Sequence, residues 1–414
     1  MDAMPFLNAA IWLISAVSVI YLVYFGLFLP HTLGRAPKYP HSAPRCRFAV
    51  LAAARNEEAV VGNLVETLLA QAYPRELFDV IVIPNNCTDD TAGAAARAGA
   101  QIFECRYPVR AKGDALRQVI AALMRTDKYD AVCVFDADNL VDPGFLAAMN
   151  DAWCAGARAA QGYRDSKNPT DTAISSCYSI YYWMVNRLFS HTRACVGLSA
   201  VVNGSGFMVS MDWLRAHGGW NTVTLTEDIE FTTRCILGGE RVAWVPAAKT
   251  YDEQPLTFAQ SWRQRCRWSV GLYQCLRVYG GQLLAARGNA RARLDQLLFL
   301  LAPLTQVLYV ISLIMTGMLW ALRIHFDLAP YSDMLYQPML SAAVSFVGTV
   351  LLALAVIVLE RKPVLAMAKG VLAYWLFILS WVPINVYCLF KPNLEWKAIR
   401  HTRSVRLTQM RQPR

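Results

Sequence analysis

Charged residues are scarce in this sequence. Asp, Glu, Lys and Arg make up 17% of its 414 residues, and hydrophobic residues make up 55%, whereas soluble domains carry about 25% charged residues. The mean hydropathy of the chain is positive. This composition excludes an ordinary soluble domain and predicts a protein embedded in a bilayer.

Paired cysteines are missing as well. The eleven cysteines are scattered along the chain, and none of them forms a Cys-x-x-Cys pair. The sequence therefore suggests neither a zinc site nor a disulfide framework, and we expect the main domain to lie in the reducing cytosol. The chain also lacks internal repeats, low-complexity segments and, at Met1-Asp2, the basic leading region of a cleaved signal peptide.

The sequence contains several long apolar stretches. A helix needs about 20 apolar residues to cross a bilayer, and four stretches are long enough: Phe6 to Leu29, Leu297 to Leu322, Met339 to Leu359, and Gly370 to Phe390. They predict an N-terminal transmembrane helix (1–30), a cytosolic domain (31–255), amphipathic interface helices (256–295), three C-terminal transmembrane helices (296–390) and a basic tail (391–414).

Basic residues at both ends of the polar domain predict which side of the membrane it occupies. Cytoplasmic segments next to membrane spans carry an excess of Lys and Arg. One group follows the first stretch and another precedes the second: His31, Arg35, Lys38, Arg45 and Arg47, then Arg287, Arg291 and Arg293. Both ends of the domain are therefore expected inside the cell.

The basic tail conflicts with four simple crossings. With the domain inside, three later crossings would leave the tail outside, yet it carries Lys391, Lys397, Arg400, Arg403, Arg406, Arg411 and Arg414. Either one apolar stretch is re-entrant or interfacial, or the chain has an extra crossing. We expect a cytoplasmic tail.

The polar domain alternates apolar runs with helical patterns, which predicts an α/β fold with a doubly wound mixed sheet. Strands are expected at Phe48 to Ala53, Val80 to Ile83 and Ala131 to Phe135, and helices at Glu58 to Gln71, Lys112 to Arg125 and Pro143 to Ala155, with Pro143 in the first helical turn. Ligands of such sheets bind beyond the carboxyl ends of the strands, where Asn56, Glu57, Asn85 and Asp136 fall.

Two carboxylates follow one of these strands. Asp136 and Asp138 come directly after the apolar run that ends at Phe135. A short acidic string is often a solvated loop, but the end of a buried strand aims its side chains at the crevice. Hard oxygen ligands of this kind suit Mg²⁺ or Mn²⁺ that also binds diphosphate oxygens.

A second acidic string, Thr226-Glu227-Asp228, opens the helical pattern from Ile229 to Leu237. Acidic residues at a helix start stabilise the helix dipole, which is one interpretation of this string. A carboxylate at such a position is also held rigidly, as a general base must be. Both interpretations can hold for Asp228.

The third string, Gln264-Arg265-Cys266-Arg267-Trp268, lies in a basic and aromatic stretch that could form a helix flat on lipid headgroups. Gln264 and Arg267 are three residues apart and would face the crevice together. Arg267 could neutralise a leaving diphosphate, and Trp268 could stack on a sugar ring. The residues expected to face lipid are Leu256, Phe258, Trp262, Tyr273 and Leu276.

Together the three strings resemble family 2 glycosyltransferases with the GT-A fold, in particular membrane-embedded synthases of the cellulose, hyaluronan and chitin type. The resemblance covers roughly residues 45 to 280. It implies that Asp136 and Asp138 bind the metal and the donor diphosphate and that Asp228 deprotonates the acceptor. It also implies donor contacts from Asn56, Glu57 and Lys112, and acceptor and diphosphate contacts from Gln264, Arg267 and Trp268.

The sequence departs from this family at Asn85, where relatives usually carry an Asp that holds uracil. An Asn carbonyl can still accept a hydrogen bond from uracil N3–H, so the change leaves donor affinity and base choice open. Asp89 matches an acidic position of the same loop, although Asp89 and Asp90 could instead start the helix that follows at Thr91.

The resemblance implies an inverting hexosyltransferase that adds sugar from a nucleotide sugar, expected to be UDP-linked, to a growing β-linked polysaccharide at the plasma membrane. Two alternatives remain: addition of one sugar to a lipid acceptor, and a non-catalytic nucleotide-sensing or scaffold subunit. Expected partners are the donor, a polysaccharide or lipid acceptor, membrane lipids, and either further copies of the chain or a synthase subunit, with no nucleic acid.

Polar residues in the apolar stretches allow two interpretations. Thr305, Tyr309, Ser312 and Thr316 share one helical face, and Tyr374, Trp381 and Asn385 share another. Such faces could guide a polysaccharide, or they could pack membrane helices together.

Overall fold

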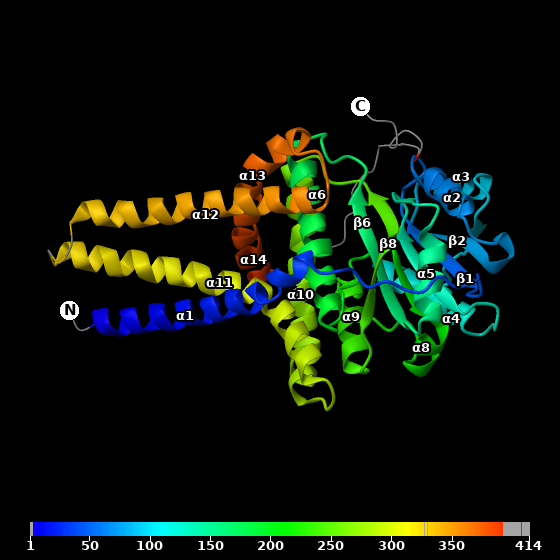
Figure 1. Ribbon diagram of the computed structural model, residues 1–414, viewed down its shortest axis with the longest axis horizontal. Coiled ribbons are helices and arrows are strands. Elements are labelled where there is room, and N and C mark those ends of the chain that lie inside the picture. The colour runs from blue at the N-terminus through cyan, green and yellow to red at the C-terminus, as the bar shows by residue number, and fades with distance from the viewer. Residues whose placement is uncertain (1–2, 327, 329, 392–406, 408–414) are drawn as a thin grey trace.

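A mixed eight-stranded sheet forms the centre of the globular part of the computed structural model, which describes residues 3–326, 328, 330–391 and 407 (Figure 1). The strand order is β3-β2-β1-β4-β7-β6-β8-β5. The strands are β1 (Phe48–Ala54), β2 (Phe78–Pro84), β3 (Gln101–Ile102), β4 (Ala131–Asp136), β5 (Leu140–Val141), β6 (Ala159–Ser166), β7 (Phe207–Ser210) and β8 (Val242–Asp252).

Each face of the sheet has its own hydrophobic core, because successive side chains of a strand point to opposite faces. Leu51 and Val134 face one core, and Val50 and Cys133 face the other. The helices around the sheet are α2 (Val61–Leu69), α3 (Thr91–Arg97), α4 (Lys112–Leu123), α5 (Phe145–Cys154), α6 (Ala173–Met184), α7 (Thr192–Cys195), α8 (Met211–Ala216) and α9 (Glu227–Leu237). This arrangement confirms the predicted doubly wound mixed sheet.

Two helices begin later than the sequence predicted. The helix expected from Glu58 begins at Val61, because residues 57–60 form a turn in which the Glu57 carbonyl accepts from the Val60 amide (3.0 Å). Pro143 is not in the first turn of α5. It precedes the N-cap residue Gly144, and its carbonyl accepts from the Ala72 amide instead (2.8 Å).

The carboxyl ends of β1, β2, β4, β6 and β8 meet at one edge of the sheet. These strands run in the same direction, because β7 pairs antiparallel with both β4 and β6. Ala53 at the end of β1 pairs with Asp136, and Ala54 pairs with Pro84. The loops that follow these strands therefore collect polar side chains at a single edge.

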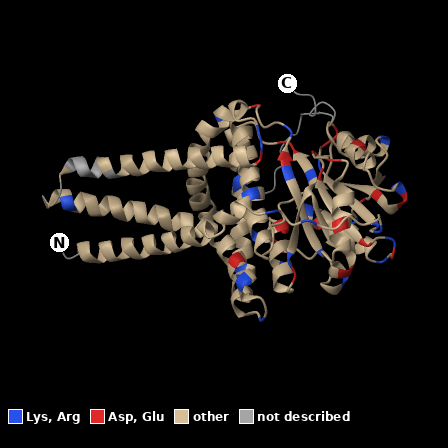
Figure 2. Cartoon of the chain, in the orientation of Figure 1, with Lys and Arg blue, Asp and Glu red and all other residues tan. Residues whose placement is uncertain are grey.

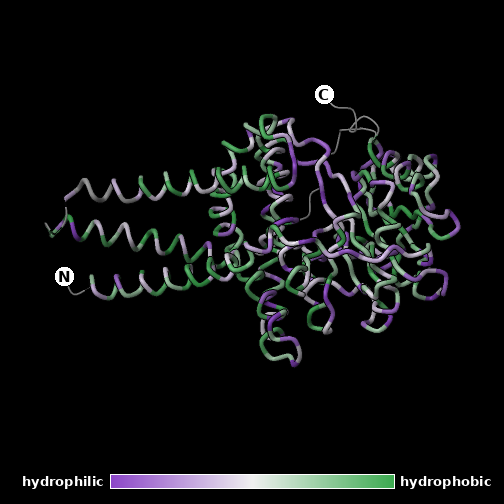
Figure 3. The backbone as a smooth tube through the Cα atoms, viewed as in Figure 1, coloured by the Kyte–Doolittle hydropathy of each residue, from purple (hydrophilic) through white to green (hydrophobic). Residues whose placement is uncertain are grey.

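Three long helices, α1 (Ala3–Gly26), α11 (Ala290–His325) and α12 (Tyr331–Leu359), extend from the globular part in the same direction (Figure 1). They carry few charged residues (Figure 2), and hydrophobic residues dominate along much of their length (Figure 3). By length and composition, four segments could cross a membrane: Met4–Leu33, Ala290–His325, Pro338–Leu359 and Leu365–Phe390.

The last of these segments differs from the others in direction. It consists of α13 (Ala368–Leu379) and α14 (Trp381–Phe390), which run across the direction of the three long helices and lie beside α6 and α10 (Phe258–Ala285) (Figure 1). Gly370 allows α13 to approach α6, because a Cβ at residue 370 would lie 2.3 Å from the Ser176 Cβ. Arg265 of α10 donates to the Phe377 carbonyl (2.9 Å) and caps α13 where it ends.

Short 3₁₀ and π segments complete the described chain: η1 (Leu29–Leu33), η2 (Arg75–Leu77), η3 (Val185–His191) and η4 (Leu365–Met367). Of the predicted basic tail, only Lys391 and residue 407 fall within the described residues.

Two ion pairs connect the long helices to the globular domain. The fully buried Arg193 of α7 pairs with Asp295 of α11 (2.9 Å), and the Tyr24 hydroxyl of α1 donates to the same carboxylate (2.9 Å). Arg187 of η3 pairs with Glu360, the residue that follows α12 (2.6 Å). All three long helices are thus joined to the domain through polar contacts.

Candidate active site

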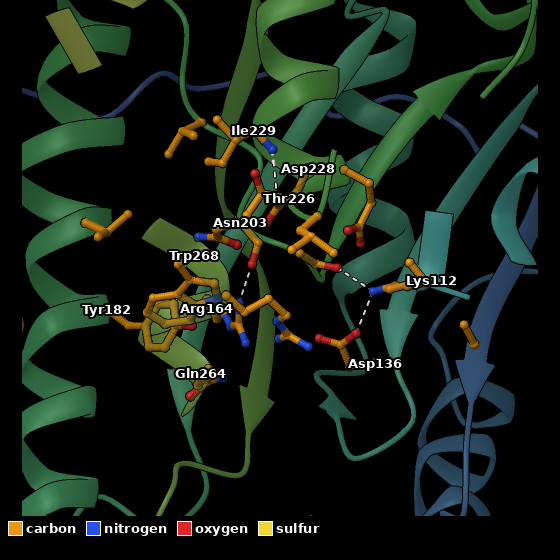
Figure 4. Close-up of a pocket in the computed structure, with 18 of the residues that line it drawn as sticks. Lys112, Asp136, Arg164, Tyr182, Asn203, Thr226, Asp228, Ile229, Gln264 and Trp268 are labelled. Carbon is orange, nitrogen blue, oxygen red and sulfur yellow. Dashed lines mark hydrogen bonds and ion pairs between the residues drawn. The ribbon is translucent and has the colours of Figure 1, made fainter. Parts of the chain in front are cut away.

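A cavity of about 290 Å³ opens at the carboxyl edge of the sheet, next to the base of the long helices. Most of the residues predicted from the sequence line it. They are Glu57, Asn85, Lys112, Asp136, Asp138, Asp228, Gln264, Arg267 and Trp268. The structure therefore brings the three sequence strings together in one cavity, and Figure 4 shows several of these side chains.

Lys112 and Asp136 form an ion pair on one side of the cavity (Figure 4). The Lys112 Nζ lies 2.5 Å from Asp136 Oδ1 and also donates to the Gly204 carbonyl (2.7 Å). Burial opposes ionisation of Asp136, but the positive charges of Lys112 and Arg164 outweigh it and hold the pKa of this carboxyl below its usual value. Asp136 is therefore a carboxylate near neutral pH.

Asp136 and Asp138 have the chemistry of a Mg²⁺ or Mn²⁺ site. Both are carboxylates on the cavity wall, and Asp138 Oδ2 is oriented by the backbone amide of Glu253 (3.1 Å). No cluster of three or more His, Cys, Asp or Glu side chains at metal spacing occurs within the described ranges. Two protein carboxylates fit a hard cation that takes its remaining ligands from diphosphate and water.

Asp228 and Glu227 begin α9 on another wall of the cavity. Asp228 Oδ1 accepts from the Ile229 amide (2.8 Å), which fixes the carboxylate at the helix start (Figure 4). Burial raises the pKa of Asp228 above its usual value. Burial, followed by the negative charge of Asp228, raises the pKa of Glu227 to about 7. Two neighbouring carboxyls thus ionise in succession beside the cavity.

One face of α10 supplies Gln264, Arg267 and Trp268 to the cavity, as the sequence predicted. Arg267 makes no hydrogen bond or ion pair with any residue that the structure describes, and the buried Gln264 Oε1 likewise has no such partner. Both groups can therefore bind a ligand without first breaking a contact within the protein.

An aromatic wall surrounds Trp268. Its ring stacks on Tyr181 and on Trp381, with centroids 6.0 Å and 6.1 Å apart. Trp381 is the first residue of α14 and lines the cavity together with Tyr182. Flat aromatic faces of this kind bind the apolar faces of sugar rings.

Two polar residues of the predicted membrane faces, Tyr374 and Asn385, contact neighbouring helices. The Tyr374 hydroxyl contacts Met184 Sδ (3.1 Å), and Asn385 Nδ2 donates to Gln306 Oε1 (2.8 Å). Thr305 donates to the carbonyl of Ala302 in its own helix (2.8 Å). These contacts favour the packing interpretation for Tyr374 and Asn385, whereas Trp381 faces the cavity.

Part of the predicted lipid-facing surface of α10 is covered by protein. The Tyr273 hydroxyl donates to the Asn385 carbonyl (3.1 Å), and Leu276 packs in a cluster with Leu300 of α11. Tyr273 and Leu276 are only partly exposed, because α11 and α14 pack on that side of the helix. That their exposed surface faces lipid stays a prediction. Phe258 remains 48% exposed.

Sequence reasoning missed several polar residues of the cavity, among them Arg164 and Asn203. Arg164 pairs with Asp252 and donates to the Asn203 carbonyl. Both polar atoms of the Asn203 side chain are buried and lack a hydrogen-bond partner among the described residues (Figure 4). The sequence feature that could have indicated Asn203 is the neighbouring pair Gly204 and Gly206. These two residues lie in a turn and have φ angles of +89° and +64°, which suit glycine.

The Asn85 side chain has a definite orientation in the cavity wall. Its amide nitrogen donates to the carbonyls of Ala54 (3.0 Å) and Ile83 (3.3 Å), and its Oδ1 accepts from Arg55 (3.2 Å). A carboxylate could not make the two donations. This network uses both polar atoms of the Asn85 side chain and holds it in place.

Asn56 and Asp89 lie outside the cavity lining and organise the neighbouring loop. Asn56, with φ +57°, accepts from the Thr88 amide (2.7 Å). Asp89 accepts from the Thr91 hydroxyl and the Glu58 amide (2.5 and 3.2 Å), while Asp90 caps α3. In this structure both residues support the cavity rim rather than its wall.

Residues 44–271, more than half of the chain, match the family described as "Glycosyltransferase like family 2". The chain belongs to this family. The predicted family and GT-A fold are thereby confirmed, and the cavity is the candidate active site of a family 2 glycosyltransferase.

Several curated glycosyltransferases resemble this one. A beta-monoglucosyldiacylglycerol synthase from Synechocystis is 27% identical over 274 residues, which cover 63% of this chain and 55% of the relative. A poly-beta-1,6-N-acetyl-D-glucosamine synthase from Staphylococcus aureus is 25% identical over 231 residues, which cover 55% and 54%. The chain thus spans about half the length of these curated relatives.

A solved structure shares the fold of this glycosyltransferase. It is a mannosyltransferase from Pyrobaculum calidifontis, described in complex with GDP-Man and Mn²⁺. The match has a TM-score of 0.62 at 16% identity and covers 93% of this chain and 99% of the other. The likeness therefore extends over the long helices as well as the sheet.

Proposed function

We propose that this glycosyltransferase moves a sugar from a nucleotide sugar, expected to be UDP-linked, to an acceptor hydroxyl at the membrane surface, with inversion at the anomeric carbon. The observation that carries the proposal is the lining of one cavity by Asp136, Asp138, Asp228 and Arg267. Acidic groups for a cation and a proton thus stand opposite a cationic group for diphosphate.

The donor would lie along the Asp136 side of the cavity. Lys112 and Arg267 would bind its diphosphate, and Asn85 would lie near its base. Asp136 and Asp138 would hold Mg²⁺ or Mn²⁺, a cation that would neutralise negative charge on the leaving diphosphate. The mannosyltransferase of the same fold, described with GDP-Man and Mn²⁺, supports a nucleotide-sugar donor and a divalent ion.

Asp228 would act as the general base. It would take the proton of the acceptor hydroxyl as the new bond from oxygen to C1 forms and the bond from C1 to the phosphate oxygen breaks, with the electron pair leaving on the nucleoside diphosphate. A single displacement inverts C1, so an α-linked donor would give a β-linked product.

The membrane placement that we propose has three crossings, by α1, α11 and α12. The catalytic domain then lies in the cytoplasm at the plasma membrane, and α13 and α14 lie along the membrane surface. This placement is supported by the transverse direction of α13 and α14 (Figure 1). It also keeps Lys391 on the cytoplasmic side, which removes the conflict with the charge rule.

Two acceptors are candidates. The growing β-linked polysaccharide predicted from the sequence is supported by the aromatic wall around Trp268 and by the similarity to the poly-N-acetylglucosamine synthase. A lipid acceptor is supported by the apolar side of the cavity and by the similarity to the glucolipid synthase.

The test is an assay of the purified protein in lipid with labelled UDP- and GDP-sugars. We expect release of nucleoside diphosphate with at least one donor, loss of this release when a chelator removes divalent ions, and recovery when Mn²⁺ or Mg²⁺ is added. Sizing the labelled product separates a polymer from a glycolipid. Absence of release with every donor would contradict the enzymatic function and favour a non-catalytic role.

A further inference from the structure

Apolar side chains also line the cavity, and we call the part of the cavity that six of them line the apolar arm. Its residues come from η3, α9, α10, α11 and the loop before β7: Val185, Phe189, Val201, Ile229, Leu272 and Phe299. None of them takes part in the donor chemistry. The other arm carries the charged residues Lys112, Asp136 and Arg164, so the cavity as a whole is amphipathic.

The apolar arm begins next to the general base. Ile229 follows Asp228 in α9, and its backbone amide donates to that carboxylate. Figure 4 places Ile229 on the side of Asp228 away from Lys112 and Asp136. A molecule that presents a hydroxyl to Asp228 can therefore extend into the apolar arm without entering the donor arm.

The apolar arm also reaches the membrane helices. Phe299 belongs to α11, one of the segments that could cross the bilayer, and its ring lies 5.0 Å from the ring of Phe189 in η3. Ile229, Leu272 and Phe299 are only partly buried and pack at the edge of one hydrophobic cluster. The arm thus includes a side chain of a helix that is long and apolar enough to cross a membrane.

We propose that this arm binds the hydrocarbon chain of an amphiphilic acceptor, which enters from the bilayer beside α11. The inference rests on the proposed glycosyl transfer at the same site. The acceptor's hydroxyl lies at Asp228, its polar head contacts the aromatic wall of Trp268 and Trp381, and its chain passes Leu272 and Phe299. The product is a glycolipid.

A polysaccharide fits this arm poorly. Its hydroxyls would lose water against side chains that offer no hydrogen bonds, which disfavours binding. A hydrocarbon chain gains from the same contacts, because its transfer out of water is favourable. The apolar lining of the arm therefore favours a hydrocarbon chain over a polysaccharide.

The experiment compares acceptors that differ only in chain length. Labelled donor is supplied to the protein in lipid nanodiscs with methyl, hexyl or dodecyl glucoside, or with a glucose oligomer. Each methylene that becomes buried favours binding about fourfold, so we expect kcat/KM to rise by about tenfold or more from methyl to hexyl glucoside. A glucose oligomer that is extended to a polymer as efficiently as dodecyl glucoside would overturn the proposal.

Variants separate binding in the arm from simple partition into the bilayer. Phe299→Trp and, independently, Leu272→Phe narrow the arm, and we expect each to lower the dodecyl-to-methyl ratio of kcat/KM by about tenfold. The matched control is Leu313→Trp, because Leu313 lies on α11 and is 52% exposed away from the cavity. An unchanged ratio in both narrowing variants would contradict the proposal.

A binding measurement keeps this inference separate from the proposed function. A dodecyl glucoside with a photoreactive diazirine at the end of its chain is cross-linked to the protein without nucleotide, and the labelled peptides are mapped. We expect labelling at Phe189 and Phe299. Labelling confined to exposed faces of α1 and α12 would contradict the proposal that the arm binds the hydrocarbon chain. Labelling of the arm by a protein that hydrolyses no donor would refute the enzymatic function and leave the lipid site intact.

Discussion

Gly271 of α10 packs against Thr226, the residue that caps α9, so closely that a Cβ at residue 271 would lie 2.4 Å from the Thr226 hydroxyl oxygen. Only glycine allows this approach. The contact holds two of the sequence strings together, because Asp228 follows Thr226 by two residues and Arg267 precedes Gly271 by one helical turn. Glycine at residue 271 thereby sets the separation between the proposed base and the proposed diphosphate ligand.

We predict that Gly271→Ala lowers kcat by about 100-fold, because a displacement of about 1 Å in a catalytic group has an effect of that size. Gly281→Ala is the matched control. Gly281 lies in the same helix, and a Cβ at residue 281 would meet no atom within 4 Å, so this variant is expected to keep full activity. Steady-state kinetics of both variants provide the test, and equal activities would show that the close contact is not needed.

Asp228→Asn should remove the proposed general base while preserving the shape of the side chain. We expect transfer to fall by at least ~100-fold, with nucleotide binding retained, because Asp228 contacts the backbone of α9 rather than the donor arm. Single-turnover transfer and nucleotide titration measure the two properties. Near-normal transfer would remove Asp228 from the mechanism, and Asp212→Asn on the exposed surface serves as the control.

Nucleotide binding should weaken as pH rises through about 7. This is the value to which burial and the negative charge of Asp228 raise the pKa of Glu227. Below this pH Glu227 is neutral, so Lys112 and Arg267 act on the diphosphate alone. Above it the carboxylate competes for both cations. One pKa unit of interaction corresponds to about tenfold in the dissociation constant of UDP.

Calorimetric titration of UDP between about pH 6 and pH 8 tests this linkage. Glu227→Gln should remove the pH dependence, whereas Glu76→Gln, which changes an exposed carboxylate, should keep it. A flat profile in the unaltered protein would contradict the assigned ionisation.

The buried pair of Arg193 and Asp295 should be important for stability. Asp295→Asn leaves the Arg193 guanidinium buried without a countercharge, which costs about 3–5 kcal/mol. We expect a clear decrease in the thermal unfolding midpoint in detergent. Asp127→Asn is the control, because Asp127 is fully exposed and pairs with Arg215 at the surface, where little effect is expected.

Trp381 should contribute to acceptor binding and not to donor binding. Its ring stacks on Trp268, so Trp381→Ala removes one face of the aromatic wall, and we expect the acceptor KM to rise by about tenfold. Trp375→Ala, in α13 and outside the cavity lining, is the matched control. An increase in donor KM alone would assign Trp381 to the other arm.

Much of the candidate site could be predicted because its chemistry is concentrated in short strings. Asp136 and Asp138 directly follow a strand, Asp228 begins a helix, and Gln264 and Arg267 share a helical face. In each case local geometry fixes where the side chain points. The apolar periodicity likewise predicted β1, β2, β4, α2, α4 and α5, but not the two-residue strands β3 and β5.

The missed residues depend on long-range topology. Arg164 and Asn203 meet only because β7 is inserted antiparallel between β4 and β6, and no local pattern encodes that insertion. The sequence placed Trp381 on one helical face with Tyr374 and Asn385, and of these three only Trp381 lines the cavity. Its place in the cavity follows from the break between α13 and α14. Arg265 stabilises this break by donating to the Phe377 carbonyl near the end of α13.

The two ion pairs at the base of the long helices also limit the geometry of any substrate. Arg193 and Arg187 tie the catalytic domain to α11 and to the end of α12, so in the proposed placement the domain would not swivel or rise freely above the bilayer. The distance between Asp228 and the membrane surface would then be fixed. In the proposed placement the enzyme would select acceptors whose reactive hydroxyl lies at the same height above the membrane as Asp228.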